Sequence, residues 1–368
     1  MKIGILTSSR ADYGIYYPLL MALKEDPFFS IEIIAFGTHL SPFHGYTIDY
    51  IIKDGFEVNH RIETVVAGDS EDSITTSMGI TLIKFSEFWK IYKREFDLVF
   101  CLGDRYEMFA AISSGIPFNV HFAHLHGGER TLGAIDNVFR HSITLASKIH
   151  FTACEEYKQR VIDLIESKEN VFNVGALSLD NLISLSLLSV KEMYNQFGID
   201  FNIPTILSTI HPETVSIEKN NRNIIEICKV FKNLENFQVV ITMPNADTEG
   251  TKYREAFLAL EKNYSNITCV ENFGSKGYFS AMKHCYFLLG NSSSGLIEAA
   301  SLKKYVINVG IRQQGRLHSN NVIHVPFDEQ KINNAVKTFS DGKDYMGTNI
   351  FYNGGAVNKI IKTLKGIK

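Results

Sequence analysis

LGDRYEMF at residues 102–109 and FAHLHGGERTLGAIDNVFRHS at residues 122–142 form the stretch around which the chain is organised. Asp104 follows the apolar run DLVFCL, Glu129 follows VHFAHLHGG, and Asp136 stands just before an expected helix. In an open parallel sheet, ligands bind along the edge where the strands end, and a carboxylate at that edge is desolvated. The stretch therefore predicts an active-site edge that carries three candidate acids and bases.

Strands and helices alternate on both sides of this stretch. KIGILT (2–7) and IEIIAFG (31–37) read as strands with a helix between them, and residues 74–96 read as a long helix around the only tryptophan, Trp89. Residues 56–75 are polar and receive no assignment. Strands that alternate with helices through short loops are typical of a parallel, doubly wound sheet.

The second half of the chain repeats this alternation. A segment rich in Ser, Leu and Asn follows residue 177, and a new strand begins in TILSTIHPE (205–213). At 368 residues the chain is long for one core, so we predict two α/β domains, residues 1–177 and 178–368. The closing amphipathic helix in NGGAVNKIIKTLKGIK (353–368) either caps the second domain or packs across the cleft between the two.

Composition and charge narrow the function classes. Residues are 45% hydrophobic, which suits two cores, yet no apolar run approaches the roughly 18 residues of a membrane span. A net charge of −3 gives no basic surface for nucleic acid or anionic lipid. The five cysteines have no metal-type or disulfide-type spacing, and the N-terminal apolar run is too short for a secretory signal. We therefore expect a cytoplasmic protein with reduced cysteines.

Two loops have the composition of phosphate sites. The first is SSR at the exit of strand one, where Arg10 is the candidate contact and a purely structural role is the alternative. The second is GNSSSGLIE (290–298), where free backbone N–H groups would meet an anion and Glu298 would reach a ribose, or where serines simply cap a helix. Arg312 follows in a glycine-flanked loop. GxGxxG and Walker A motifs do not occur, which disfavours the usual dinucleotide and P-loop folds.

Other polar residues share the edge expected for the second sheet. His211 ends a strand and could transfer protons, although a strand-end histidine is often structural. Asn245 and Asp247 follow the next strand, and Tyr278 could stack on a base or belong to the core. These residues complete the candidate set.

Several motifs in this order resemble the UDP-N-acetylglucosamine 2-epimerase family, above all its hydrolysing branch of bacterial sialic-acid biosynthesis. The resemblance spans residues 1–325 and rests on SSRADYG, GTHLS, FHGYT, LGDRYE, HLHGGERTLGAIDNVFRHSIT, HPET, NADT, GNSSSGLIE and NVGIRQQGR. It implies two Rossmann-like domains in a GT-B-like arrangement with the active site in the interdomain cleft. It further implies a homodimer that uses neither a cofactor nor a metal.

The implied reaction converts UDP-N-acetylglucosamine and water to N-acetylmannosamine and UDP through 2-acetamidoglucal. By motif match, Asp104, Glu129 and Asp136 are the acid/base carboxylates and His211 is the catalytic histidine. The resemblance and the loop composition together predict UDP contacts from Arg10, Asn245, Asp247, Tyr278, Ser292, Ser293, Ser294, Gly295, Glu298 and Arg312.

Three alternatives stay open. The same reaction could use UDP-2,4-diacetamido-2,4,6-trideoxyglucose, although relatives with that substrate tend to carry HIEGG where this chain has HLHGG, so His126 favours N-acetylglucosamine. A retaining GT-B glycosyltransferase would require an acceptor sugar and leaves Asp136 without a task. A UDP-sugar-binding sensor gains little from buried carboxylates, because desolvating them costs several kcal/mol.

Overall fold

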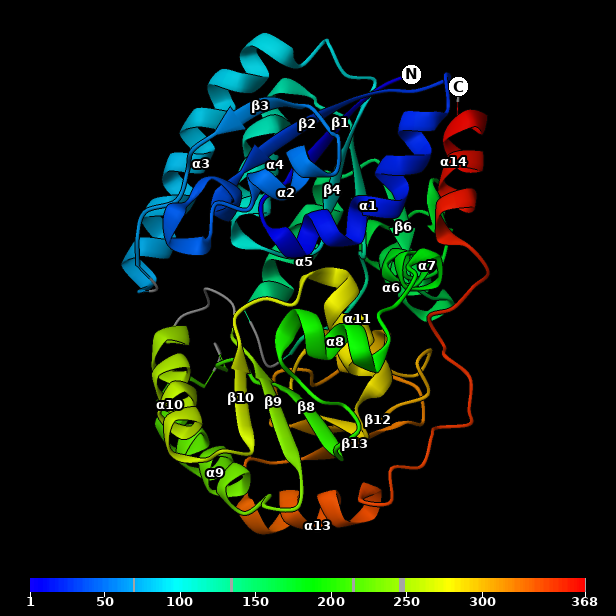
Figure 1. The fold of residues 1–368 in the computed structure, drawn as a ribbon. Coiled ribbons are helices and arrows are strands. Elements are labelled where there is room, and N and C mark those ends of the chain that lie inside the picture. Colours follow the sequence, from blue (N-terminus) through cyan, green and yellow to red (C-terminus); the bar gives the residue numbers. More distant parts are fainter. Residues whose placement is uncertain (69, 133–134, 214–215, 245–248, 368) are drawn as a thin grey trace. The chain divides into compact units, whose positions relative to one another are not determined.

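The structure is a computed structural model that describes residues 1–68, 70–132, 135–213, 216–244 and 249–367 (Figure 1). Contacts divide the chain into two compact units. Unit 1 comprises Met1–Glu129, Asp136–Ile183 and Phe351–Lys368, and unit 2 comprises Arg130–Ile135 and Ser184–Ile350. The predicted domains were residues 1–177 and 178–368. In the structure, residues 178–183 and 351–368 belong to unit 1, and the short segment 130–135 belongs to unit 2.

The sheet of unit 1 is parallel, and its described strands lie in the order β3-β2-β1-β4-β5-β6-β7. The strands are β1 (Lys2–Thr7), β2 (Ser30–Phe36), β3 (Val58–Ile62), β4 (Leu98–Leu102), β5 (Phe122–Leu125), β6 (Ile149–Thr152) and β7 (Val171–Asn173). The helices are α1 (Arg10–Glu25), α2 (Ile48–Lys53), α3 (Glu71–Tyr92), α4 (Tyr106–Gly115), α5 (Asp136–Ala146), α6 (Glu155–Ile165), α7 (Leu177–Ser184) and α14 (Ala356–Gly366).

Helices bury apolar side chains on both faces of this sheet, as the continuous apolar strands require. On one face α3, α4 and α5 pack around Trp89, which is fully buried and donates from its indole nitrogen to Ala111 O at 3.1 Å. The long helix expected around Trp89 is thus present, and it contributes to the core. On the other face α1 and α2 pack on the strands, together with Ile360 and Leu364 of α14.

The C-terminal helix packs within unit 1. Figure 1 shows α14 beside α1, and Lys365 of α14 forms an ion pair with Asp26 at 2.5 Å. Before α14, the ring of Phe351 stacks on Tyr157, and Phe351 O accepts from Ala176 N at 3.0 Å. These contacts explain why the chain from residue 351 onward belongs to unit 1. Of the two placements that the sequence left open for this helix, these contacts rule out a cap on the second domain.

Unit 2 contains a second parallel sheet, with its described strands in the order β10-β9-β8-β11-β12-β13. The strands are β8 (Thr205–Thr209), β9 (Gln238–Thr242), β10 (Ile267–Val270), β11 (Phe287–Gly290), β12 (Tyr305–Val309) and β13 (Val322–Val325). The helices are α8 (Val190–Phe197), α9 (Asn220–Lys232), α10 (Gly250–Asn263), α11 (Gly274–His284), α12 (Ser293–Ile297) and α13 (Glu329–Phe339). One apolar cluster joins α9, α10 and α13 to the sheet, and another joins α8, α11 and α12.

Both sheets reverse their strand order at one point, between β1 and β4 in unit 1 and between β8 and β11 in unit 2. Open α/β sheets bind ligands beyond the carboxyl ends of the strands at such a switch point. Asp104 follows β4, and His211 and Ser292 follow β8 and β11. The fold thus brings candidate residues to the switch point of each sheet, and the predicted α/β class with two parallel sheets is confirmed.

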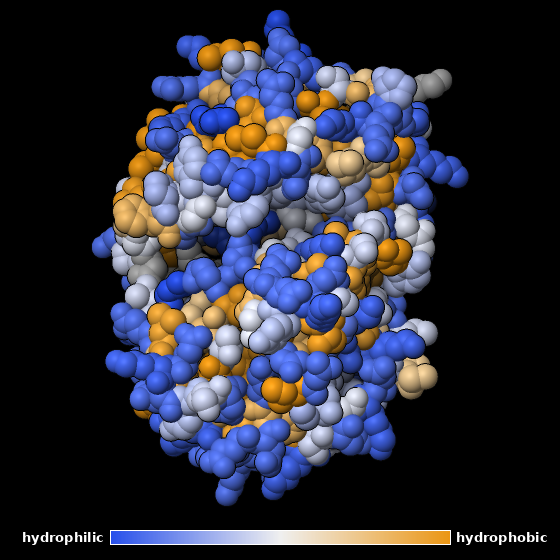
Figure 2. Space-filling view, in the orientation of Figure 1, coloured by the Kyte–Doolittle hydropathy of each residue, from blue (hydrophilic) through white to orange (hydrophobic). Residues whose placement is uncertain are grey.

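The visible surface is mainly hydrophilic, with hydrophobic residues in small groups between (Figure 2). Within the described parts of the chain, none of the helices combines the length and the apolar character needed to cross a membrane.

Candidate active site

Arg140 contacts the carboxylate of one predicted acid, Asp104, and the backbone of another, Glu129, at the edge of the unit 1 sheet. It projects from α5, forms an ion pair with the carboxylate of Asp104, and donates from Nη1 to Glu129 O at 3.2 Å. Asp104 follows β4 and Glu129 follows β5, which is the neighbouring strand. The Arg140 side chain is only 2% exposed, while Asp104 is 25% exposed, so Arg140 fixes the loops and Asp104 remains reachable from solvent.

Glu129 is buried and paired with a histidine. His126 Nδ1 lies 2.8 Å from Glu129 Oε1, and both side chains are nearly inaccessible. His126 adopts φ +66°, a left-handed conformation that costs a residue with a Cβ about 1–3 kcal/mol and is frequent at functional sites. The turn continues through Gly128, where a Cβ would lie 2.2 Å from Tyr157 O. The tight turn in HLHGGE and the contact with His126 thus hold the Glu129 carboxylate in one orientation.

Asp136 is the first residue of α5, one helical turn before Arg140. A carboxylate in the first turn is stabilised by the positive end of the helix dipole. The structure therefore places all three predicted carboxylates on or beside the Arg140 helix in unit 1.

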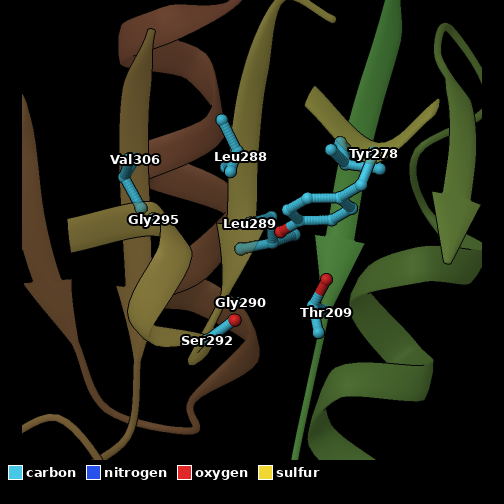
Figure 3. A pocket seen from close by; sticks show the side chains of 9 residues that line it. Thr209, Tyr278, Leu288, Leu289, Gly290, Ser292, Gly295 and Val306 are labelled. Carbon is cyan, nitrogen blue, oxygen red and sulfur yellow. The ribbon is translucent and has the colours of Figure 1, made fainter. Parts of the chain in front are cut away.

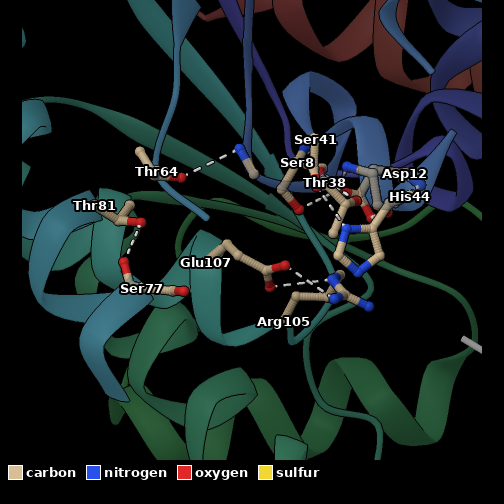
Figure 4. A network of polar contacts seen from close by, with 12 residues as sticks. Ser8, Asp12, Thr38, Ser41, His44, Thr64, Ser77, Thr81, Arg105 and Glu107 are labelled. Carbon is tan, nitrogen blue, oxygen red and sulfur yellow. Dashed lines mark hydrogen bonds and ion pairs between the residues drawn. The ribbon is translucent and has the colours of Figure 1, made fainter. Parts of the chain in front are cut away.

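The turn that carries Arg10 is held by Asp12 (Figure 4). Ser8 N and Oγ donate to Asp12 Oδ2 at 2.9 and 2.6 Å, and Ser9 Oγ and Asp12 form the capping box that begins α1. Thr38 Oγ1 also donates to Ser8 O at 3.0 Å. Arg10 itself is the first residue of α1 and is exposed. The turn is therefore rigid at its base and presents a guanidinium on its outside.

An ion pair lies close to this turn in Figure 4. Arg105 donates to Glu107 through Nε and Nη2 at 3.1 and 2.9 Å, and the Glu107 carboxylate is fully buried. Burial, and then the Arg105 guanidinium, lower the pKa of the neighbouring His44. Sequence reasoning did not single out Arg105 or Glu107, although both lie in the LGDRYE motif.

In unit 2, His211 directly follows β8 and its backbone is tied to the end of β11. His211 N donates to Asn291 Oδ1 at 2.7 Å, and Asn291 Nδ2 donates back to His211 O at 2.9 Å. Arg312 Nη1 donates to Pro212 O at 2.9 Å. The structure thus brings His211, the loop after β11 and Arg312 to one edge of this sheet.

The serine loop after β11 borders a pocket that Figure 3 shows. Ser292 is the N-cap residue of α12 but makes no side-chain capping hydrogen bond, and Tyr278 OH lies 2.6 Å from Ser294 Oγ, so the tyrosine ring is held beside the loop. Burial raises the pKa of Tyr278, so its hydroxyl stays protonated. The pocket is lined by Leu207, Thr209, Tyr278, Leu288, Leu289, Gly290, Ser292, Gly295 and Val306.

Five predicted UDP contacts remain, of which three lie on or beside α12. Ser293 opens α12, and Glu298 is buried at its end. A Cβ on Gly295 would approach Val306 to 3.0 Å, so this position packs closely on β12. Asn245 and Asp247 lie outside the described residues.

The polar residues that organise the edges, Arg140, Asp12 and Asn291, are absent from the sequence-based set. Their sequence signals were weak: Asp12 stands three residues after Ser9, as a capping box requires, and Arg140 stands four residues after Asp136. Across the described ranges, His, Cys, Asp and Glu form no group of three or more that could hold a metal ion.

Known proteins share this arrangement. A family model described as UDP-N-acetylglucosamine 2-epimerase matches residues 21–365. Over 345 residues the chain is 36% identical to polysialic acid biosynthesis protein P7 of Escherichia coli, covering 93% of this chain and 87% of that one. It is 34% identical over 339 residues to GDP/UDP-N,N'-diacetylbacillosamine 2-epimerase (hydrolyzing) of Campylobacter jejuni, covering 92% and 86%. The crystal structure of UDP-GlcNAc 2-epimerase from Neisseria meningitidis bound to UDP-GlcNAc matches all of both chains with a TM-score of 0.83 at 17% identity.

Two parallel α/β units with this topology and this structural match define a GT-B-like fold. The chain belongs to the UDP-N-acetylglucosamine 2-epimerase family and is a UDP-sugar 2-epimerase. The family predicted from the motifs is thereby confirmed, and the names of both relatives fit its hydrolysing branch.

Proposed function

We propose that the protein is a hydrolysing UDP-N-acetylglucosamine 2-epimerase. It converts UDP-N-acetylglucosamine and water to N-acetylmannosamine and UDP. The observation that carries the proposal is that Asp104 and Glu129, at the ends of neighbouring strands, are tied to one arginine, Asp104 through its carboxylate and Glu129 through its backbone oxygen, while His126 holds the Glu129 carboxylate. Carboxylates fixed in this way can accept and return a proton without moving.

The reaction has two steps, an elimination and a hydration. In the first, a carboxylate takes the proton from C2 of the sugar while the C1–O bond breaks, which leaves 2-acetamidoglucal and UDP. In the second, water adds across the C1–C2 double bond, and its hydroxyl joins C1. A proton joins C2 on the face opposite to the one from which the first proton left, so the configuration at C2 is inverted. Asp104, Glu129 and Asp136 supply the proton transfers, and His211 assists the departing phosphate or holds the sugar.

The edge of the unit 2 sheet supports a UDP site. The departing diphosphate carries negative charge, which backbone N–H groups and a guanidinium stabilise. Ser292, Ser293 and Ser294 at the start of α12 and Arg312 after β12 offer such groups. We assign Glu298 to the ribose, Tyr278 to the uracil side of the site, and Arg10 of unit 1 to the diphosphate.

A second candidate is the same reaction on UDP-2,4-diacetamido-2,4,6-trideoxyglucose. The relative from Campylobacter jejuni, named for diacetylbacillosamine, favours it at 34% identity, while the polysialic-acid relative at 36% identity fits N-acetylmannosamine formation. We favour N-acetylglucosamine because His126 occupies the first position after β5. A retaining glycosyltransferase has no comparable support, since it requires no C2 acid or base.

The test is turnover of UDP-N-acetylglucosamine followed by NMR in heavy water. We expect release of UDP and N-acetylmannosamine that carries deuterium at C2. Asp104→Asn should abolish both signals, because an amide cannot accept the proton. Failure of the wild type to release UDP, or product without deuterium, would contradict the proposal. Equal concentrations of the two UDP-sugars decide between the candidate substrates.

We further propose that the enzyme works in the cytoplasm. All five cysteines are unbridged, as expected in a reducing compartment. Fractionation of cells that express the chain would test this, and recovery in a secreted or periplasmic fraction would contradict it.

A further inference from the structure

We propose that Asn291 and Glu213 are positioning residues, which hold His211 in fixed register with the serine loop at 292–295 and with the Arg312 loop. The inference rests on the proposed function insofar as His211 takes part in the reaction. It concerns contacts within unit 2 only.

Asn291 makes a hydrogen bond with each of its polar groups. Its side-chain amide pairs with both the N–H and the C=O of His211, at 2.7 and 2.9 Å. Its own N–H donates to Thr209 O at 3.0 Å, and its C=O accepts from Gln313 Nε2 at 2.7 Å. Asn291 is fully buried. One residue therefore links the ends of β8 and β11 to the loop after β12.

Neither aspartate nor glutamine can reproduce the two-point pairing of this amide. An aspartate at position 291 would accept from His211 N but would face His211 O with a second acceptor instead of a donor. A glutamine would be one methylene too long for the same two-point pairing. Because Ser292 follows directly, any shift of Asn291 moves both His211 and the first residue of the serine loop.

Glu213 makes the second link. Its Oε1 accepts from Ile311 N at 2.6 Å, and its backbone N–H and C=O pair with the side chain of Asn220 at 3.0 and 3.2 Å. Gly310 has φ +80°, and a Cβ there would lie 2.2 Å from Glu213 Oε1. The Arg312 loop therefore packs directly on the carboxylate of Glu213, a residue that is 3% exposed.

The function of these links follows from their geometry. A diphosphate bound to the serine loop and to Arg312 contacts two loops. Both loops are hydrogen-bonded to residues 211–213, the first through Asn291. His211 is then held in one position relative to the leaving phosphate. Reacting groups depend steeply on such placement, since an error of about 1 Å can cost about a hundredfold in rate.

Matched substitutions test the proposal in the full chain. Asn291→Asp should lower kcat for UDP-N-acetylglucosamine about a hundredfold, with a much smaller change in UDP affinity by calorimetry. The control is Asn321→Asp, which makes the same chemical change at a fully buried asparagine whose Nδ2 donates to Lys304 O, before β12. Both variants should lose thermal stability, but only Asn291→Asp should lose turnover.

Glu213 offers a rescue experiment. Glu213→Gln keeps an oxygen that accepts from Ile311 N and should keep kcat, whereas Glu213→Ala removes the acceptor and should lower kcat. If glutamine is as damaging as alanine, the carboxylate charge itself is required and the positioning role is wrong. Wild-type turnover by Asn291→Asp would also overturn the proposal while leaving the proposed function intact.

Amide hydrogen exchange, measured with UDP and without substrate, tests the proposed link independently of catalysis. In the wild type, UDP should slow amide exchange both in the serine loop and in the peptide that contains His211, and Asn291→Asp should lose the second effect. If the wild type shows no slowing around residues 210–213 when UDP is added, the link does not operate. That result would overturn the inference whether or not the enzyme releases UDP from its substrate.

Discussion

Arg140 is the residue on which the carboxylate edge of unit 1 depends. A lysine there keeps the positive charge, but its single ammonium cannot reach Asp104 and Glu129 O in the same way as the planar guanidinium. We expect Arg140→Lys to lower kcat by about ten- to a hundredfold and to leave UDP affinity unchanged. Steady-state kinetics and calorimetry measure the two quantities.

The control for Arg140 is Arg160→Lys, which changes an arginine paired with Glu156 at 2.5 Å on α6 of the same unit. That pair joins two residues of one helix and includes none of the predicted carboxylates, so its replacement should leave kcat at the wild-type value. Equal losses in both variants would mean that arginine is needed for folding and not for the site.

Buried neutral histidines should make the stability of unit 1 fall in acid. Burial lowers the pKa of His39 to about 4 and of His124 to about 3. The unfolded chain protonates these rings below about 6.5, so it binds more protons than the folded chain between that pH and the folded pKa. Stability therefore drops as pH falls through this window, by up to about 1.4 kcal/mol per pH unit for each ring.

Denaturant unfolding between pH 7.5 and pH 5 measures this slope. His124→Gln removes one of these buried rings and should flatten the curve, although its stability at pH 7.5 falls because the bonds to Gly103 O and Thr144 Oγ1 change. An unchanged slope in that variant would show that other groups govern the acid sensitivity.

At the residue scale, sequence and structure agree where a feature is local. The carboxylates could be placed at strand ends because a buried parallel strand is a continuous apolar run whose end is visible in the sequence. The partners of those residues could not be found in this way. His211 and Asn291 are 80 positions apart, and only the pairing of β8 with β11 brings them together.

At the element scale, two edge strands could not be predicted from the sequence. β3 and β13, which were not predicted, lie at sheet edges, and exposed polar residues interrupt the apolar run of each. The central strands β1, β2 and β4 were predicted close to their observed bounds, because they are largely buried.

Among the helices whose N-caps the structure describes, α1 and α8 begin with a capping box, which permits a controlled comparison. In α1 the box joins Ser9 and Asp12, and in α8 it joins Ser189 and Glu192. Asp12→Ala and Glu192→Ala should each cost about 1 kcal/mol of stability. Only Asp12→Ala should weaken UDP binding, because Arg10 lies in the capped turn. Calorimetry with UDP checks this, and equal UDP affinities in both variants would remove Arg10 from the proposed site.

At the scale of the whole molecule we expect a homodimer that uses α3. Ile83 and Ile91 on this helix are 64% and 69% exposed, which favours burial against a second copy. Light scattering should give twice 41.5 kDa for the wild type and a value near 41.5 kDa for the double variant Ile83→Lys/Ile91→Lys. Ile225→Lys, at a 55% exposed position on α9, should stay dimeric. A monomeric wild type would refute the prediction.

Binding of UDP should make the whole chain more compact. The proposed contacts come from both units, Arg10 from unit 1 and the serine loop and Arg312 from unit 2, so one bound nucleotide would restrain the two units together. We expect UDP to lower the radius of gyration measured by solution scattering. Arg10→Ala should still bind UDP through unit 2, but with a smaller decrease, whereas Arg94→Ala, at an exposed arginine after α3, should respond as the wild type does. Equal radii with and without saturating UDP would mean that one unit binds the nucleotide alone, and Arg10 would then lose its proposed role.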